Sequence, residues 1–298
     1  MTSRNKVIFG IFGFYAFSLI AVVAIFGFTR HDNDHFLPQN EFKLDTWIAL
    51  PGPLDFNKAV MYLFIAGILT CVTMIWIARR MEARPNRVQT AVEALYSLMR
   101  DNITKGNMDD AMARKWFPFI GTLFLFIWYS NLIGYIPLPT NTEHTFNFFG
   151  VDVPSFAIYA ATANLSIPLV LALVVFVSYT VEGIRAKGLG GYLKALIPGG
   201  VSGAMVLLIF PLEFLSNFMR IISLSVRLFA NILAGHLIIL FMSGGLAVLL
   251  GVEALGVVTL PIGIALFLFE VGLVATLQAF IFATLTAIYL GGAVAEHH

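Results

Sequence analysis

The stretch Ile221-Ile-Ser-Leu-Ser-Val-Arg-Leu-Phe-Ala-Asn-Ile-Leu-Ala-Gly-His236 places an arginine inside an apolar segment long enough to cross a membrane. The guanidinium of Arg227 keeps its charge at every ordinary pH, so it is a permanent cation at lipid depth. Insertion of such a charge costs at least ~2.5–3.5 kcal/mol. Arg227 must therefore face protein or water, and we interpret it as a site that moves or binds a charged species.

The composition is that of a membrane protein. Hydrophobic residues make up 59% of the 298 residues and charged residues only 12%, whereas a soluble globular domain needs about 25% charged residues. The net charge of +1 gives no reason to expect nucleic acid as a partner. Cys71 is the single cysteine, which excludes an intrachain disulfide. The sequence contains no glycine-rich phosphate loop and no soluble catalytic motif, and we expect neither a cofactor nor a bound metal ion.

The apolar segments predict an all-α polytopic membrane protein with about six membrane helices, because one crossing needs ~20 mostly apolar residues. The segments are Val7–Phe28, Ala59–Ala78, Trp116–Leu138, Phe156–Val181, Val201–Met242 and Leu255–Leu290. The last two are longer than one perpendicular crossing requires, so we expect a long, tilted or broken antiparallel hairpin over residues 201–290. We divide the chain into an N-terminal membrane helix with an outer polar cap, residues 1–58, and a core, residues 59–298.

The distribution of Lys and Arg predicts how the chain is oriented in the membrane. Of the 18 basic residues, 13 lie at the N-terminus, within residues 79–115, or in the loop expected after Val181. The opposite side has only Arg30, Lys43 and Lys58. Six helices with both termini in the cytoplasm satisfy this bias. Within the cytoplasmic segment, apolar residues at helical spacing predict an amphipathic helix over residues 88–104, lying on the membrane or against a partner.

The first apolar segment, Val7–Phe28, is open to two interpretations. Arg4 and Lys6 followed by an apolar run resemble a secretory signal. The run of 22 residues is long for a signal, however, and no clear small-residue cleavage site follows it. We therefore expect an uncleaved anchor helix at the periphery of the fold, and a cleaved signal is the alternative.

Polar residues form one stripe on the helix that contains Arg227. Glu213, Arg220 and Arg227 are seven residues apart each time, so at 3.6 residues per turn they lie nearly on one face. Asn231 joins them one turn later. His236 is nine residues past Arg227, about half a revolution away, so it lies on a different face. We expect one charged stripe and one separate ionisable residue.

The final helix carries Glu270 and Gln278. If the two last helices form an antiparallel hairpin, residues at the same depth have numbers with a constant total. Arg227 with Gln278 gives 505 and His236 with Glu270 gives 506, so one register pairs both. The two levels are about 14 Å apart at ~1.5 Å per residue. A His and a Glu at one level exchange protons readily, because each charged form stabilises the other.

Each of these residues also has a structural interpretation. Arg220 can snorkel to the lipid headgroups, which the central position of Arg227 prevents. An intramembrane carboxyl such as Glu213 can be a protonated, hydrogen-bonded structural group. Gln278 and His236 can join neighbouring helices by hydrogen bonds alone. The shared register of the two pairs favours the functional interpretation.

Six motifs, in this order along the chain, resemble those of subunit a of F-type ATP synthases. They are Phe117-Pro-Phe-Ile, Ser130-Asn-Leu-Ile-Gly-Tyr-Ile-Pro137, Thr162-Ala-Asn-Leu-Ser166, Pro211-Leu-Glu-Phe-Leu-Ser216, Ser223-Leu-Ser-Val-Arg-Leu-Phe-Ala-Asn-Ile-Leu-Ala-Gly-His236 and Leu277-Gln-Ala-Phe-Ile-Phe282. The resemblance covers nearly all of the chain from about Ala59. It implies a stator subunit that packs beside a rotating ring of c subunits.

The resemblance also assigns roles to residues. Arg227 matches the family's essential arginine, Asn231 the asparagine one turn on, and Gln278 the glutamine that faces the arginine. His236 and Glu270 correspond to the interacting ionisable pair of the inlet channel. Asn131 matches a channel asparagine, Glu213 a glutamate toward one side, and Arg220 is a further candidate. Eight residues separate the glutamate from the glutamine here, whereas seven are usual in the family.

The implied mechanism couples proton flow to rotation. Protons enter through an outer half-channel near His236, neutralise a ring carboxylate, and leave through an inner half-channel past Glu213 once Arg227 has displaced them. The implied partners are the c-subunit ring, b-type peripheral stalk subunits, the rest of the complex and membrane lipid. ATP chemistry then belongs to partner subunits. We expect a bacterial plasma membrane, with an organellar membrane as the alternative; the alternative function is a secondary transporter that binds an anionic solute at an intramembrane arginine.

Overall fold

The computed structural model describes much of the chain from the second expected membrane helix onward. The described residues are Phe17, Ile20, Leu44, 46–48, 56–80, 86–148, 151–195, 204–246 and 254–295. Within them, five helices are long and apolar enough to cross a membrane, and the expected all-α polytopic membrane fold is confirmed. The first of the six expected helices, Val7–Phe28, lies outside the described residues except for Phe17 and Ile20.

The described membrane helices coincide largely with the apolar segments. They are α2 (Lys58–Arg80), α4 (Asp110–Ile133), α5 (Ser166–Ala195), α6 (Ala204–Leu240), α8 (Ala254–Phe269) and α9 (Ala275–Val294). The π-helical turn η5 (Glu270–Val274) joins α8 directly to α9, and a second π-helical turn, η4 (Phe241–Gly245), continues α6. The last two apolar segments are therefore long helices, each interrupted or extended by a π turn.

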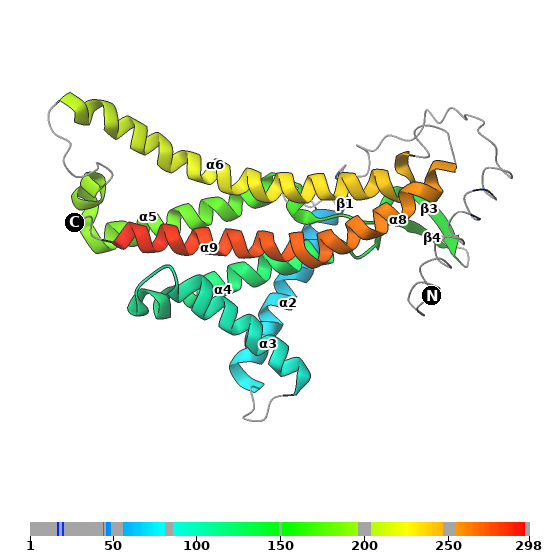
Figure 1. Ribbon diagram of the computed structural model, residues 1–298, viewed down its shortest axis with the longest axis horizontal. Helices are drawn as coiled ribbons and strands as arrows, with labels where there is room; N and C mark the ends of the chain where they lie inside the picture. The colour runs from blue at the N-terminus through cyan, green and yellow to red at the C-terminus, as the bar shows by residue number, and fades with distance from the viewer. Residues whose placement is uncertain are drawn as a thin grey trace, which may run out of the picture.

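Helices α6 and α8–α9 run antiparallel as the two longest rods of the molecule (Figure 1). Toward the start of α6 the two rods diverge, and α5 packs against both of them. Helix α4 packs on another side of α9, and α2 packs against α4. The 37 residues of α6 span about 55 Å at ~1.5 Å per residue, nearly twice the ~30 Å hydrocarbon core. The hairpin must therefore be strongly tilted in the membrane.

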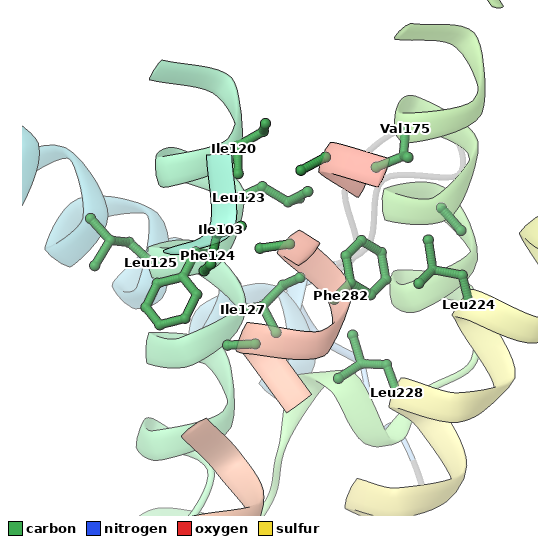
Figure 2. Close-up of a cluster of buried hydrophobic side chains, with 14 of the residues drawn as sticks. Ile103, Ile120, Leu123, Phe124, Leu125, Ile127, Val175, Leu224, Leu228 and Phe282 are labelled. Atoms are coloured by element: carbon green, nitrogen blue, oxygen red, sulfur yellow. The ribbon is translucent and has the colours of Figure 1, made fainter. Parts of the chain in front are cut away.

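The core lies where α4, α5, α6 and α9 meet. Phe282 of α9 is buried and points toward Leu224 and Leu228 of α6 (Figure 2). Ile127 of α4 and Val175 of α5 belong to the same buried cluster. The inward face of α6 carries leucines and isoleucines, and their packing sets the orientation of the helix. These buried residues are Ile221, Leu224, Leu228, Ile232 and Ile239.

Helix α3 (Arg87–Ser97) and the π-helical segment η2 (Leu98–Lys105) occupy the segment in which we expect an amphipathic helix. The side chain of Asn86 caps α3, because its Oδ1 accepts a hydrogen bond from the Gln89 backbone N–H at 2.8 Å. Met99 and Ile103 are buried in the core, and η2 packs against α4. We call the end of the bundle that carries α3 and η2 the basic end.

The expected boundaries of the fourth apolar segment, Phe156–Val181, are wrong at both ends. Its first residues belong to β4 (Val151–Ala157), which pairs antiparallel with β3 (Leu138–Phe148) in a hairpin that the apolar pattern does not reveal. Helix α5 begins only at Ser166, and Pro168 lies in its first turn, where a missing N–H costs nothing. We call the end of the bundle that carries β3 and β4 the hairpin end, after this β-hairpin and not after the long helical hairpin of α6 and α8–α9.

The segment expected as a loop after Val181 is helical and extends α5 by about four turns to Ala195. It carries Arg185, Lys187 and Lys194. Gly188 interrupts the helix with φ 71°, in the left-handed region that glycine adopts without strain. Hydropathy does not reveal this part of the helix, because the segment is polar. Lys and Arg are nevertheless good helix formers where their side chains meet water.

An ion pair ties α4 to α5 at the basic end. Lys115 donates a hydrogen bond from Nζ to Oε1 of Glu182. The side chain of Glu182 is only 6% exposed, whereas that of Lys115 is 52% exposed. A buried carboxylate needs this partner, since an unpaired charge away from water is strongly destabilising.

We predict that Lys115→Ala lowers the stability of the chain by about 1–3 kcal/mol, because it leaves the Glu182 charge buried and unpaired. The thermal unfolding midpoint of the protein in detergent measures this. Lys105→Ala is the matched control: Lys105 pairs with Asp101 at 3.9 Å, and both side chains are exposed. Its loss should be within about 0.5 kcal/mol. Equal midpoints for the two variants would contradict the prediction.

Candidate functional site

Helix α6 presents two different faces, as its residue spacing predicts. Arg220, Arg227 and Asn231 are exposed, and Glu213 is half-buried. His236 is only 4% exposed and points into the fold. The same packing that buries the leucines of α6 therefore directs one stripe of polar residues outward and the histidine inward.

Arg227 lies on an uncovered face of the chain. Three of its neighbours on that face, Ser223, Ala230 and Ala234, are small and exposed. Among the described residues, no hydrogen bond or ion pair involves the guanidinium. A permanent cation at membrane depth needs a counter-charge or water. The partner of Arg227 must therefore come from outside the described part of this chain.

The register of the long hairpin agrees with the sequence arithmetic. A Cβ on Gly235 would lie 2.5 Å from the carboxyl carbon of Glu270, and a Cβ on Gly263 would lie 2.9 Å from the carbonyl oxygen of Met242. The residue numbers of both pairs total 505. Two independent close approaches thus confirm the antiparallel register, and both depend on glycines whose missing side chains let the helices meet.

This register puts Arg227 and Gln278 at one level, but their side chains point in different directions. Gln278 is 3% exposed and lies inside the bundle, whereas Arg227 is exposed. No hydrogen bond between them is present in the described structure. The chain therefore brings the two residues to the same depth without joining them.

His236 is held by the backbone of two elements. Its Nδ1 lies 3.0 Å from the carbonyl oxygen of Ile232, one turn earlier in α6. Its Nε2 lies 3.3 Å from the carbonyl oxygen of Gly134, at the end of α4. Carbonyl oxygens only accept hydrogen bonds, so both contacts can be made at once only when both ring nitrogens carry a proton. The ring is thus placed to take up and return a proton.

Tyr135 connects His236 to Glu270. The Tyr135 hydroxyl donates to Oε2 of Glu270 at 3.1 Å, and its ring lies 4.6 Å from the imidazole, centroid to centroid, at 32°. No direct bond joins His236 to Glu270 within the described structure. Sequence reasoning missed Tyr135, although it stands in the motif Ser130-Asn-Leu-Ile-Gly-Tyr-Ile-Pro137, directly after the end of a membrane helix.

The π turn η5 explains the unusual spacing between Glu270 and Gln278. In an unbroken α-helix, residues eight apart are rotated by about 80° from each other. The i→i+5 bonding of a π turn accommodates one more residue per turn. Because η5 begins at Glu270, it absorbs the additional residue, and both side chains face the fold. The departure from the family spacing therefore does not turn Glu270 outward.

Asn131 lies one turn before Tyr135 and is fully buried. Its Oδ1 accepts a hydrogen bond from the Thr162 hydroxyl at 2.8 Å, and its Nδ2 donates to the carbonyl oxygen of Ala275 at 3.3 Å. It therefore joins α4, the short helix η3 (Ala161–Ala163) and the start of α9. Asn131, Tyr135, His236 and Glu270 form one polar site near the hairpin end, which we call the buried polar site.

A second polar cluster lies in the first half of α6, toward the basic end. Arg220 places its guanidinium over the ring of Tyr289, 5.3 Å from the centroid. The Tyr179 hydroxyl donates to Oδ1 of Asn217 at 2.7 Å, and Asn217 Nδ2 donates to the Tyr192 hydroxyl at 3.4 Å. Arg220 is thus held against the protein rather than free. Sequence reasoning missed the three tyrosines, because each is isolated in the sequence and only the packing of α5 and α9 on α6 brings them together.

The family model and the similar proteins agree on one family. The family model described as "ATP synthase A chain" matches residues 60–291. ATP synthase subunit a of Myxococcus xanthus is 36% identical over 258 residues, which cover 84% of this chain and 78% of the relative. The subunit a proteins of Pseudarthrobacter chlorophenolicus and Bradyrhizobium diazoefficiens are 30% and 35% identical, over 90% and 82% of this chain and 97% and 90% of the relatives.

We predict that Gly235→Ala lowers stability by only about 1 kcal/mol, because the added methyl group would displace the Glu270 carboxyl, which is the end of a flexible side chain. Adding Glu270→Ala to the same chain should restore much of the loss, since residues in contact are not additive. Gly292→Ala, where a Cβ would meet no heavy atom within 4 Å, is the control. Thermal unfolding in detergent is measured for the unchanged protein, the two single variants, the double variant and the control. A double variant that loses the full total of both single changes would contradict the contact.

Proposed function

The chain belongs to the family of ATP synthase subunit a, the proton-channel stator of the membrane sector Fo, and we propose that it carries protons through two half-channels beside a ring of c subunits. It is therefore a multi-pass membrane protein and a component of the F1Fo complex. Family membership favours this function over transport of an anionic solute, the alternative that an intramembrane arginine leaves open.

The observation that carries the proposal is the exposed position of Arg227 on a membrane helix. The cation has no partner in the described part of its own chain, and the residues around it are small. Small residues let another helix approach closely in a membrane. A carboxylate on a ring subunit supplies the missing counter-charge. Because the ring contains many such subunits, each step of its rotation brings another carboxylate to Arg227.

The proposed uptake half-channel leads to the buried polar site. Its ionisable groups, His236 and Glu270, lie near the hairpin end, away from the basic segments that we assign to the cytoplasm. Asn131 lines the same region and fixes the elements that enclose it. A proton passed from this site to a ring carboxylate neutralises it, and only a neutral carboxyl can turn through lipid at low cost.

The proposed release half-channel lies on the first half of α6, where Glu213 is half-buried. A ring carboxyl that reaches Arg227 loses its proton, because a fixed cation lowers the pKa of a neighbouring acid. The released proton leaves past Glu213 toward the basic end, and Arg220 lies beside this path. The positive charge of Arg227 also keeps protons from crossing directly between the half-channels. The membrane potential drives the transfer, with about 2.3 kcal/mol per elementary charge for each 100 mV.

We also propose a bacterial plasma membrane, with both termini in the cytoplasm. The excess of Lys and Arg between residues 79 and 115 and along the end of α5 supports this orientation. The bacterial origin of the relatives supports the location. Besides the c-subunit ring, we propose b-type peripheral stalk subunits as partners, which a stator needs in order to resist rotation.

We predict that Arg227→Ala abolishes ATP synthesis driven by a proton gradient, while ATP hydrolysis by the detached soluble head continues. Arg227→Lys should also lose most synthesis, because a compact ammonium loses its proton more readily when buried. The measurement uses membrane vesicles with the intact complex. Arg79→Ala, which removes an exposed cation at the end of α2, should retain synthesis. Normal synthesis with Arg227→Ala would overturn the proposed function.

We predict that His236 and Glu270 act as a coupled pair, because both contact Tyr135. His236→Ala and Glu270→Ala should each slow proton uptake. The double variant should lose much less than the combined effects of the single variants, since residues in one network are not additive. A double-mutant cycle on the rate of proton pumping provides the test. Strict additivity would show that the two residues act independently.

A further inference from the structure

We propose that Tyr135 is a positioning residue of the uptake site, which holds His236 and Glu270 in one fixed arrangement. The inference rests on the proposed function and adds a residue to it. Tyr135 is only 3% exposed. It is the one described residue that contacts both ionisable groups of the pair by a hydrogen bond or ring contact.

Four neighbours fix the ring of Tyr135. The imidazole of His236 lies against one face at 4.6 Å, and the ring of Phe267 meets it edge-on at 5.9 Å and 87°. Ile239 and Ala275 are buried beside it in the same cluster. A ring held in this way has one direction for its hydroxyl, and that direction leads to Oε2 of Glu270.

The hydroxyl is suited to a carboxyl that changes its protonation state. Burial, and then the neighbouring Glu270 charge, raise the pKa of Tyr135, so its hydroxyl keeps its proton and donates to the carboxylate. When Glu270 takes up a proton, its O–H can donate to the tyrosine oxygen instead, because a phenol both donates and accepts. The hydrogen bond therefore persists through each cycle of uptake and release, and Glu270 keeps its place.

The backbone contacts of His236 make this link necessary. Both ring nitrogens lie against carbonyl oxygens, of Ile232 and Gly134, so neither is directed at Glu270. The ionisable neighbours that face Tyr135 within the described structure are Glu270 from η5 and His236 from α6. Tyr135 couples the two groups geometrically, by its ring on one side and its hydroxyl on the other.

Tyr135→Phe tests the role, because it keeps the ring contacts and removes only the hydroxyl. The intact complex in vesicles is driven by an imposed gradient, and ATP synthesis is measured against the pH of the uptake side. The pH of half-maximal rate should move upward, since a carboxyl without its hydrogen-bond donor holds its proton more tightly. Incorporation of 3-fluorotyrosine at position 135 strengthens the donor and should move the profile downward.

Tyr129→Phe is the matched control. The hydroxyls of Tyr129 and Thr73 lie 2.8 Å apart and share a hydrogen bond between α4 and α2, so the variant loses a comparable bond away from the pair. Its pH profile should equal that of the unchanged protein. An unchanged profile with Tyr135→Phe, or equal shifts in both variants, would overturn the inference. If Tyr135→Phe does not assemble, the fluorotyrosine profile decides alone, and an unmoved profile is again the contrary result.

The test separates this inference from the proposed function. Arg227→Ala is measured in the same vesicles as a reference. Loss of synthesis in that variant together with an unchanged Tyr135→Phe profile would remove the role of Tyr135 and leave the proton channel in place. Retained synthesis in Arg227→Ala would instead remove the proposed function itself.

Discussion

The fold is organised around one constraint, a permanent charge in a helix that must lie in lipid. The chain does not neutralise Arg227 with one of its own described residues. It packs the leucines of α6 inward against Phe282 and leaves the arginine on an open face with small neighbours. In a soluble protein such a face would simply be hydrated. In a membrane it is incomplete without a partner that brings a negative charge, and this explains why a subunit with this helix works as part of a larger motor.

The second constraint is that protons must reach this face through a closely packed bundle. The buried polar site provides ionisable groups near the hairpin end of two antiparallel helices that are far longer than the membrane is thick. Two glycines make this close packing possible. Gly235 gives room to the Glu270 carboxyl, and Gly134 lets the end of α4 approach Ala160, because a Cβ on Gly134 would lie 2.5 Å from the alanine methyl. The strong tilt of the hairpin lets one helix contribute both to this site and to the arginine face.

Much of this arrangement follows from sequence spacing. A period of 3.6 residues separates Arg227 from His236 by half a turn, and the structure exposes the first and buries the second. The register of the two long helices follows as well, because residues at the same depth of an antiparallel pair have numbers with a constant total. The boundaries of α5 do not follow, since hydropathy cannot distinguish the apolar β4 strand from helix, or a basic helix from a loop. Tyr135 cannot be assigned from spacing, because its role depends on where α4 ends relative to η5, which is set by packing between distant segments.

The most direct measurement of the central claim is disulfide cross-linking across the Arg227 face in the intact complex. With the exposed Cys71 replaced by serine, a cysteine at Ser223 is paired with cysteines placed along the outer helix of the ring subunit. Oxidation should link Ser223→Cys to the ring at the level of its carboxylate. Ile222→Cys, exposed on another side of α6, should not link. Cross-links of equal yield from both positions, or none from Ser223→Cys, would contradict the claim that the open arginine face is where the ring binds.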